Sequence, residues 1–276
     1  ERLQNVNRIR LQLPFIGKWM VSQGYEGNIT HKGDWSKALD FIIVDQELKT
    51  YDTYAATPEN FYCYGKPVLA AADGFVEKIE DYIEDNEIGK INQNQNWGNS
   101  IVIKHAEGLY TKLSHLKKDS FKVKTGDYVK QGDIVAACGN SGRSPEPHLH
   151  FQVQTTPHIG SKTFGYPFSF YAADKNGKAT IREFMVPHET EMVYNVATSN
   201  VIKLAFEFLP GFNLSVSADG MEEGKWEVFT DAYNTSYIFC HTSKAIAYFK
   251  KNEQVFYFTS FEGDKDSLLY YFYLAC

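Results

Sequence analysis

Short apolar runs closed by turn residues make up the middle of the chain. Between about residues 60 and 155 they are 66–79 (KPVLAAADGFVEKI), 99–105 (NSIVIKH), 109–116 (LYTKLSHL) and 133–142 (DIVAACGNSG). Each run is rich in β-branched or aromatic side chains and ends at Gly, Asn or Asp, which is typical of strands and turns. The pattern predicts a mainly β fold, a compact antiparallel β-barrel or sheet with tight hairpins.

Two stretches interrupt this pattern. Residues 84–99 (EDNEIGKINQNQNWGN) are polar and predict a long exposed loop of the kind that often borders a functional cleft. Residues 172–190 lose the apolar regularity, and we place a connector at 176–190. The strand-like runs that follow, including 201–209 (VIKLAFEFL) and 267–275 (SLLYYFYLA), predict a separate antiparallel β module at 191–276, of unknown role. The first domain is then 1–175, with an N-terminal extension.

Composition removes several classes of protein. The 276 residues carry 28 basic and 34 acidic side chains, a formal net charge of −6, which argues against a nucleic-acid or anionic-membrane binder. No stretch approaches the roughly 20 apolar residues of a transmembrane helix. Residues 1–15 do not resemble a signal peptide, and a start at Glu1 is compatible with removal of an export signal. The four cysteines form no CxxC pair, which disfavours a zinc knuckle and favours buried thiols.

Three segments contain candidate chemistry. In 145–154 (PEPHLHFQVQ), His148 and His150 are two residues apart on a strand, so both imidazoles face the same side and can reach one metal ion. In 29–45 (ITHKGDWSKALDFIIVD), Asp40 comes just before an apolar run, where a carboxylate needs a compensating charge such as a metal ion. His31 lies in the same segment, and His115 ends the 109–116 run. Taken singly, each is equally an ordinary surface histidine or turn aspartate.

Together these segments resemble the lysostaphin-type (LytM-like) zinc endopeptidases of peptidoglycan. The matching motifs are His31…Asp40, LSHL at 113–116 and GNSGRSPEPHLHF at 139–151, and the likeness extends over roughly 14–170. The resemblance implies a barrel of the duplicated hybrid motif type. It also implies one zinc ion on His31, Asp40 and His150, with His115 and His148 as non-ligand catalytic residues. One of these two would accept the proton of the attacking water and the other would stabilise the oxyanion, and the sequence leaves their roles open.

One spacing departs from the family. Its best-known members have three residues between the first His and Asp, whereas eight separate His31 from Asp40, and Asp34 lies between them as a rival ligand. We prefer Asp40, because ALDF matches the family's entry into a strand, and we expect Asp34 to cap its Lys-Gly-Asp turn. Trp97 and Tyr110 are expected to line the groove, whereas His105, His158, His188 and His241 are outside the matched positions.

The resemblance implies a hydrolase that cuts peptide bonds in peptidoglycan stems or cross-bridges. Its partners would be peptidoglycan peptides, and it would be exported to the periplasm, cell envelope or extracellular space. An alternative is a catalytically inactive barrel that binds the cell wall or regulates a hydrolase. A more distant alternative is phosphotransfer through a nucleophilic histidine, for which the His31…Asp40 pair would be superfluous.

Overall fold

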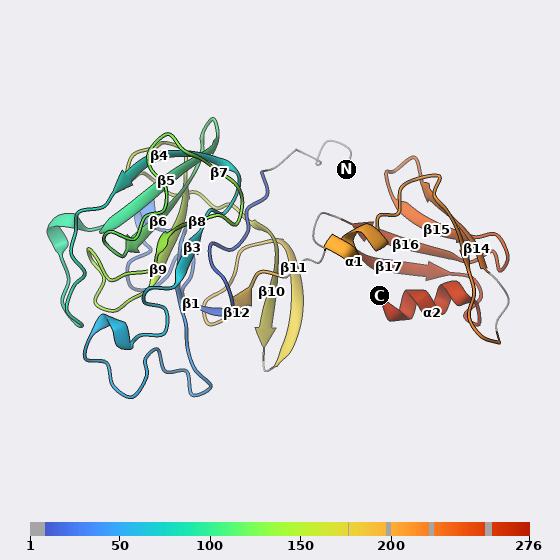
Figure 1. Ribbon diagram of the computed structural model, residues 1–276, viewed down its shortest axis with the longest axis horizontal. Helices are drawn as coiled ribbons and strands as arrows, with labels where there is room; N and C mark the ends of the chain where they lie inside the picture. The colour runs from blue at the N-terminus through green and yellow to red at the C-terminus, as the bar shows by residue number, and fades with distance from the viewer. Residues whose placement is uncertain (1–8, 176, 197–199, 221–223, 252–255) are drawn as a thin grey trace. The chain divides into compact units, whose positions relative to one another are not determined.

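The structure is a computed structural model that describes residues 9–175, 177–196, 200–220, 224–251 and 256–276 (Figure 1). The chain divides into two compact units, one within residues 7–196 and one within residues 197–276. Each unit has a hydrophobic core of its own. The mainly β, antiparallel fold expected from the sequence is confirmed.

The larger unit is built on one ten-stranded sheet with the strand order β11-β10-β12-β1-β2-β9-β6-β5-β4-β7. Neighbouring strands pair antiparallel throughout this sheet. A separate pair joins β3 (Pro67–Leu69) to β8 (Ile134–Ala137). The strands of the large sheet are β1 (Trp19–Gln23), β2 (Ala38–Ile42), β4 (Gly74–Glu80), β5 (Asn99–Ala106), β6 (Leu109–Leu116), β7 (Tyr128–Val129), β9 (Leu149–Gln154), β10 (Phe168–Lys175), β11 (Lys178–Met185) and β12 (Met192–Tyr194).

The central strands of this sheet are buried on both faces. Because side chains alternate along a strand, Leu39 and Phe41 of β2 and Leu149, Phe151 and Val153 of β9 point into the apolar core. The residues between them face the other way, and they are polar although buried: Asp40, His150, Gln152 and Gln154. The antiparallel register of β2, β9 and β6 thus assembles a buried polar layer on one face of the sheet.

The structure differs from the connector expected at 176–190. Lys178–Met185 form β11, which pairs antiparallel with β10, and Met192–Tyr194 form β12, which lies between β10 and β1 (Figure 1). Strand β11 is the edge of the sheet and most of its side chains are exposed. An edge strand in water needs little apolar alternation, which is why the sequence pattern fails there.

The smaller unit is a five-stranded antiparallel meander with two short helices. Its strands are β13 (Asn213–Val216), β14 (Gly224–Thr230), β15 (Ser236–Cys240), β16 (Ile246–Lys251) and β17 (Phe256–Glu262). The strand prediction is wrong for two runs. Residues 201–209 contain part of helix α1 (Asn200–Ala205), and residues 267–275 contain α2 (Leu268–Ala275). Ser267 begins α2 by accepting a hydrogen bond from the Tyr270 amide.

Helix α2 lies against strands β16 and β17 of the smaller unit (Figure 1). The Phe272 ring lies 5.4 Å from the rings of both Trp226 and Phe258. A run of Leu, Tyr and Phe has high strand propensity, and this packing overrides it.

Three of the cysteines, Cys63, Cys138 and Cys240, are buried free thiols, and Cys276 is an exposed one. This agrees with the expectation of small buried hydrophobes for three of the four. Among the described residues, the helices all fall short of the length and apolarity needed to cross a bilayer.

Candidate metal centre

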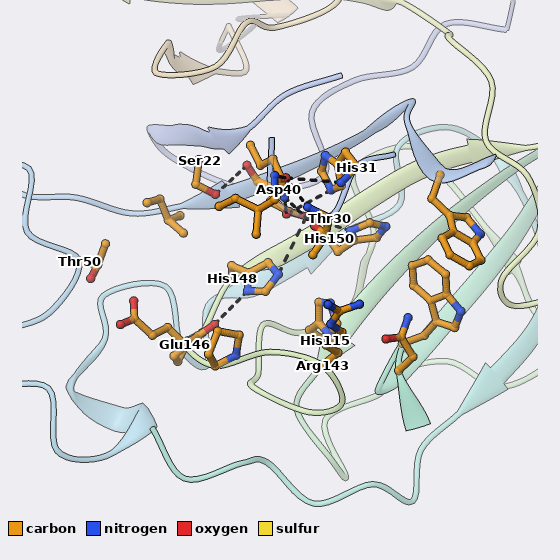
Figure 2. A pocket seen from close by; sticks show the side chains of 18 of the residues that line it. Ser22, Thr30, His31, Asp40, Thr50, His115, Arg143, Glu146, His148 and His150 are labelled. Carbon is orange, nitrogen blue, oxygen red and sulfur yellow. Dashed lines mark hydrogen bonds and ion pairs between the residues drawn. The ribbon is translucent and has the colours of Figure 1, made fainter. Parts of the chain in front are cut away.

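Three distant segments bring His31, Asp40 and His150 together (Figure 2). Asp40 and His150 are direct partners in the register of β2 and β9, so both side chains leave the sheet at the same place. His31 enters from the loop between β1 and a short 3-10 helix, Gly33–Trp35. One ligand atom from each residue lies within 4.8 Å of the other two, and all three residues are buried. This cluster is able to hold a metal ion.

Ligand atoms of the three residues face one another at short distances. His150 Nδ1 lies 2.8 Å from Asp40 Oδ1, and His31 Nε2 lies 3.2 Å from Asp40 Oδ2. Although His31 Nε2 is buried, it has no hydrogen-bond partner of acceptable geometry in the part of the chain that the structure describes. A buried polar atom without a partner is costly unless something not drawn satisfies it. Two imidazoles and a carboxylate are the donor set that zinc accepts, so the residues present fit that ion.

The outward nitrogens of both ligand histidines are already occupied. His31 Nδ1 lies 2.9 Å from Gly24 O, and His150 Nε2 lies 3.0 Å from Gln152 Oε1. A carbonyl oxygen only accepts, so each outward nitrogen carries a proton, and with a metal ion bound each inward nitrogen would turn its lone pair to that ion. This is how metal-binding histidines are usually oriented.

A chain of buried amides fixes the orientation of His150. Gln152 Nε2 donates to Gln154 Oε1 (2.8 Å) and to Ser161 O, and Gln154 Nε2 donates in turn to the carbonyls of Thr156 and His158. Because both terminal acceptors are backbone carbonyls, neither amide can be turned over without losing hydrogen bonds. Gln152 therefore offers its oxygen to His150.

Charge and burial favour the metal-binding protonation states of Asp40 and His150, but not that of His31. Burial alone would raise the pKa of Asp40, but the three surrounding histidines, His148, His150 and His31, hold that pKa well below its usual value. Burial lowers the pKa of His150 by more than Asp40 raises it. Burial also works against the protonated form of His31, but Asp40 outweighs it and the pKa is raised. Asp40 is a carboxylate, and His150 is neutral.

Gln23 at the end of β1 ties the His31 loop to the metal cluster, and sequence reasoning missed it. Its Oε1 accepts from the amides of Ile29 (3.0 Å) and Thr30 (2.8 Å), and its Nε2 donates to Asp40 Oδ2 (2.9 Å). One amide thus positions both the loop that carries His31 and the carboxylate that would share its metal. Nothing in the sequence marks this glutamine, because its partners come together only through the pairing of β1 with β2.

His115 and His148 stand beside the three ligand candidates. His115 has a left-handed backbone, with φ of +60°, at an irregularity in the pairing of β5 and β6. Such a conformation is unfavourable for a residue with a side chain and is concentrated at functional sites. The His115 and His148 rings are 4.7 Å apart, and His148 Nε2 lies 4.0 Å from Asp40 Oδ1.

Each of these two histidines uses Nδ1 to bind the backbone. His115 Nδ1 lies 2.8 Å from Ser141 O, and His148 Nδ1 lies 2.9 Å from Glu146 O, so in both rings the proton is on Nδ1 and Nε2 has a free lone pair. Burial is the largest cause that holds the pKa of His115 well below its ordinary value. His115 is therefore neutral and able to accept a proton at Nε2.

A cavity of about 440 Å³ opens onto all five residues (Figure 2). Trp97 lines it, as expected, whereas Tyr110 is buried within β6 and is not among the described lining residues. His105 bonds Asp73 O and Thr111 Oγ1, which is a structural role. The other lining residues include Ser22, Lys32, Trp35, Thr50, Asn96, Arg143 and Glu146.

Asp34, the rival ligand, lies outside the cluster. Its exposed carboxylate lies 3.2 Å from Lys162 Nζ and forms a surface ion pair with it, whereas we expected it to cap the turn. The eight residues between His31 and Asp40 contain the 3-10 helix Gly33–Trp35, and this helix takes up the extra length without moving Asp40 away from His150.

Lys112 is a second polar residue that sequence reasoning missed. It lies on β6 opposite Gln152, is fully buried, and its Nζ has no hydrogen-bond partner among the described residues. The amine sits 3.1 Å from the centroid of the Trp97 ring, over the aromatic face. Burial lowers the pKa of Lys112 well below its ordinary value. Lys112 thus packs against the ring of Trp97, which lines the cavity.

A family model matches the part of the chain that contains three of the five candidate residues. Residues 59–161 match Peptidase family M23. This segment of the chain is similar to that peptidase family. The matched range includes His115, His148 and His150, whereas His31 and Asp40 precede it and join the site through the pairing of β2 with β9. The resemblance to lysostaphin-type peptidases is confirmed.

Curated relatives are similar over part of the chain. The chain is 32% identical over 149 residues to an uncharacterized metalloprotease of Buchnera aphidicola, covering 52% of this chain and 31% of the relative. It is 39% identical over 88 residues to the peptidoglycan DD-endopeptidase ShyC of Vibrio cholerae, covering 32% and 17%. It is 37% identical over 87 residues to lysostaphin of Staphylococcus simulans, covering 31% and 17%. The chain thus spans less than a third of the length of these relatives.

Proposed function

We propose that this protein is an exported zinc endopeptidase that hydrolyses peptide bonds in peptidoglycan stems or cross-bridges. The observation that carries the proposal is the buried set of His31, Asp40 and His150, with His31 Nε2 lacking a partner and two further histidines on the same cavity. A peptidoglycan DD-endopeptidase among the relatives supports the substrate, and a cell-wall substrate requires export.

In this proposal His31 Nε2, Asp40 and His150 Nδ1 hold the zinc ion. Three protein ligands leave a further position open, as in catalytic rather than structural zinc sites. When held by these residues, a zinc ion would supply a Lewis acid for the scissile carbonyl and a water molecule that is nucleophilic near neutral pH. Gly24 and Gln152 keep the ligand rings in the tautomers that bind metal, and Gln23 holds Asp40 and the His31 loop in place.

His115 and His148 handle protons in this scheme. Each has a free lone pair at Nε2 and a fixed ring orientation, so either can accept the proton of the attacking water. The ring that carries a proton can then donate a hydrogen bond to the developing oxyanion or pass the proton to the leaving amine. The two rings are close enough to act on one substrate group.

The test is digestion of purified peptidoglycan of known cross-link type, with mass analysis of the released fragments and measurement of zinc in the same protein. The wild type should release peptide fragments and contain about one zinc per chain. His150→Ala should lose both properties. Hydrolysis that persists in zinc-free protein would eliminate the proposal, and zinc without hydrolysis would favour a binding or regulatory module.

A further inference from the structure

Two cationic side chains of the cavity have no counter-ion. Arg143 and Lys32 both line the cavity and are exposed, and among the described residues neither forms a salt bridge. The chain as a whole has a net charge of −6, and Lys37, Lys49, Lys90, Lys104 and Lys118 are each paired with a glutamate. An unpaired guanidinium on the cavity wall is therefore available to a ligand.

The backbone around Arg143 is held firmly. Its amide donates to Asn96 O (2.9 Å), and Gly142 O accepts from the Asn92 amide (2.8 Å). The Asn86 amide group donates to the carbonyls of Asn140, Gly142 and Ser144 on the same loop. Gly142 has φ of +80°, and a Cβ there would lie 2.3 Å from Gly98 N, so this loop packs directly against the backbone at Gly98. The base of the Arg143 side chain is thus fixed before a substrate arrives.

The charges on this loop divide the cavity into two ends. Figure 2 shows Arg143 and Glu146 on opposite sides of His148. Both residues are exposed and line the cavity, and each has no salt-bridge partner among the described residues. The cavity wall thus carries a cation on one side of His148 and a carboxylate on the other. Lys32 adds to the positive potential of the same cavity.

We propose that Arg143 forms a carboxylate-recognising subsite, and that the protein prefers peptides with a free carboxylate close to the scissile bond. This inference rests on the proposed function and narrows its substrate class. A guanidinium matches the two oxygens of a carboxylate with paired, charge-assisted hydrogen bonds, which a neutral amide cannot reproduce. Peptides built only of glycine carry no side-chain carboxylate, so the subsite separates acidic stem peptides from neutral bridges.

The test uses two synthetic stem peptides that differ only in whether the carboxylate nearest the cut is free or a carboxamide. With zinc-loaded, full-length protein, kcat/KM should favour the acid by about 10- to 100-fold, the usual range for one charge-assisted contact. Arg143→Gln should bring the ratio to about one, mainly by raising KM for the acid. Glu146→Gln, which removes the opposite charge from the same loop, should keep or increase the preference for the acid.

Three outcomes would overturn the subsite. Equal cleavage of acid and amide by the wild type removes it and leaves the peptidase proposal standing. A preference that survives in Arg143→Gln assigns the carboxylate to another group, such as the metal. If neither peptide is cut, the peptidase proposal is in doubt, and calorimetric titration with the same two peptides decides the subsite. There, the acid should bind about tenfold more weakly to Arg143→Gln than to the wild type, and equal binding would refute the inference.

Discussion

Each unit of this protein contains a histidine within 2.8 Å of a carboxylate, in very different surroundings. In the larger unit, His150 and Asp40 have side chains that are 6% and 8% exposed. In the smaller unit, His241 and Glu227 have side chains that are 47% and 26% exposed. The exposed pair remains in contact with water, so its ion pair adds little to the stability of the fold. The buried pair has lost its water and depends on neighbouring protein groups for its other hydrogen bonds. The same two chemical groups are a surface contact in one unit and a candidate metal site in the other.

The contrast extends to the cores of the two units. The smaller unit buries a cluster of aromatic and aliphatic side chains, among them Trp226, Phe249 and Leu269. The larger unit adds to its apolar core a layer of buried polar residues, which includes Gln23, Ser114, Gln152 and Gln154. Burying polar groups costs free energy unless each finds a partner, so an almost fully bonded polar layer indicates that function rather than stability selects it.

The largest expected effect comes from the buried carboxylate. Asp40→Ala removes one ligand and leaves His31 and His150 without a shared anion, so we expect zinc content to fall to background and hydrolysis to drop by more than about a thousand-fold. The measurements are metal analysis and fragment release from peptidoglycan. Glu227→Ala is the matched control in the smaller unit and should retain zinc. Full zinc occupancy in Asp40→Ala would show that the cluster is not the metal site.

The next effect separates proton transfer from metal binding. His115→Ala and His148→Ala should each lower kcat by about 100- to 10,000-fold, the range for loss of a general acid or base, while zinc content stays near that of the wild type. Steady-state kinetics on a soluble peptide together with metal analysis would show this. Loss of zinc in either variant would instead make that histidine a ligand.

A smaller effect is expected from the amide chain behind His150. Gln152→Leu removes the acceptor at His150 Nε2 and should weaken zinc binding by about 10- to 100-fold, as is typical for residues that orient a metal ligand. Gln152→Glu keeps an acceptor and should restore most of the affinity. Competition with a chromophoric chelator measures both. Equal affinities for the Leu variant and the wild type would remove Gln152 from the positioning role.

Lys112 is expected to oppose stability. Lys112→Met replaces a buried amine without a hydrogen-bond partner by an apolar chain of similar length, and should raise the free energy of unfolding by about 1–3 kcal/mol. Urea denaturation of the metal-free protein is the measurement, with the exposed Lys130→Met as the matched control. A loss of stability would mean that the amine's contact with Trp97 outweighs the cost of its burial.

The smallest effect is expected at the exposed pair. Glu227→Gln should change the free energy of unfolding by less than about 1 kcal/mol, and the change should shrink further at high salt. Thermal unfolding at low and high ionic strength tests this. A larger, salt-independent loss would mean that the two pairs are more alike than their exposure indicates.

Sequence reasoning was strongest where the pattern is local. The alternation from Leu149 to Gln154 and the short closed runs of the larger unit correspond to strands, and His148 immediately precedes its strand. The five candidate residues all reach one cavity. The residues it missed, Gln23, Lys112 and Gln152, are ordinary polar residues within strands. Their burial depends on which strand lies opposite, and that register is set by segments up to a hundred residues away. The predictions for the exposed edge strand β11 and the aromatic helix α2 were wrong because their sequences lack the expected pattern. Strand β11 does not alternate apolar and polar residues, and helix α2 does not show a helical spacing of apolar residues.

The position of β12 determines where the chain can be truncated to remove the smaller unit without disrupting the larger one. This three-residue strand, Met192–Tyr194, bridges β10 and β1, and Asn195 just after it bonds the backbone of Leu13 and Phe15. Ending the polypeptide after Thr190 would detach the β10–β11 hairpin from the strand that carries Gln23. Ending it after Val196 would leave every strand of the large sheet in place, so only the latter truncation isolates the role of the smaller unit.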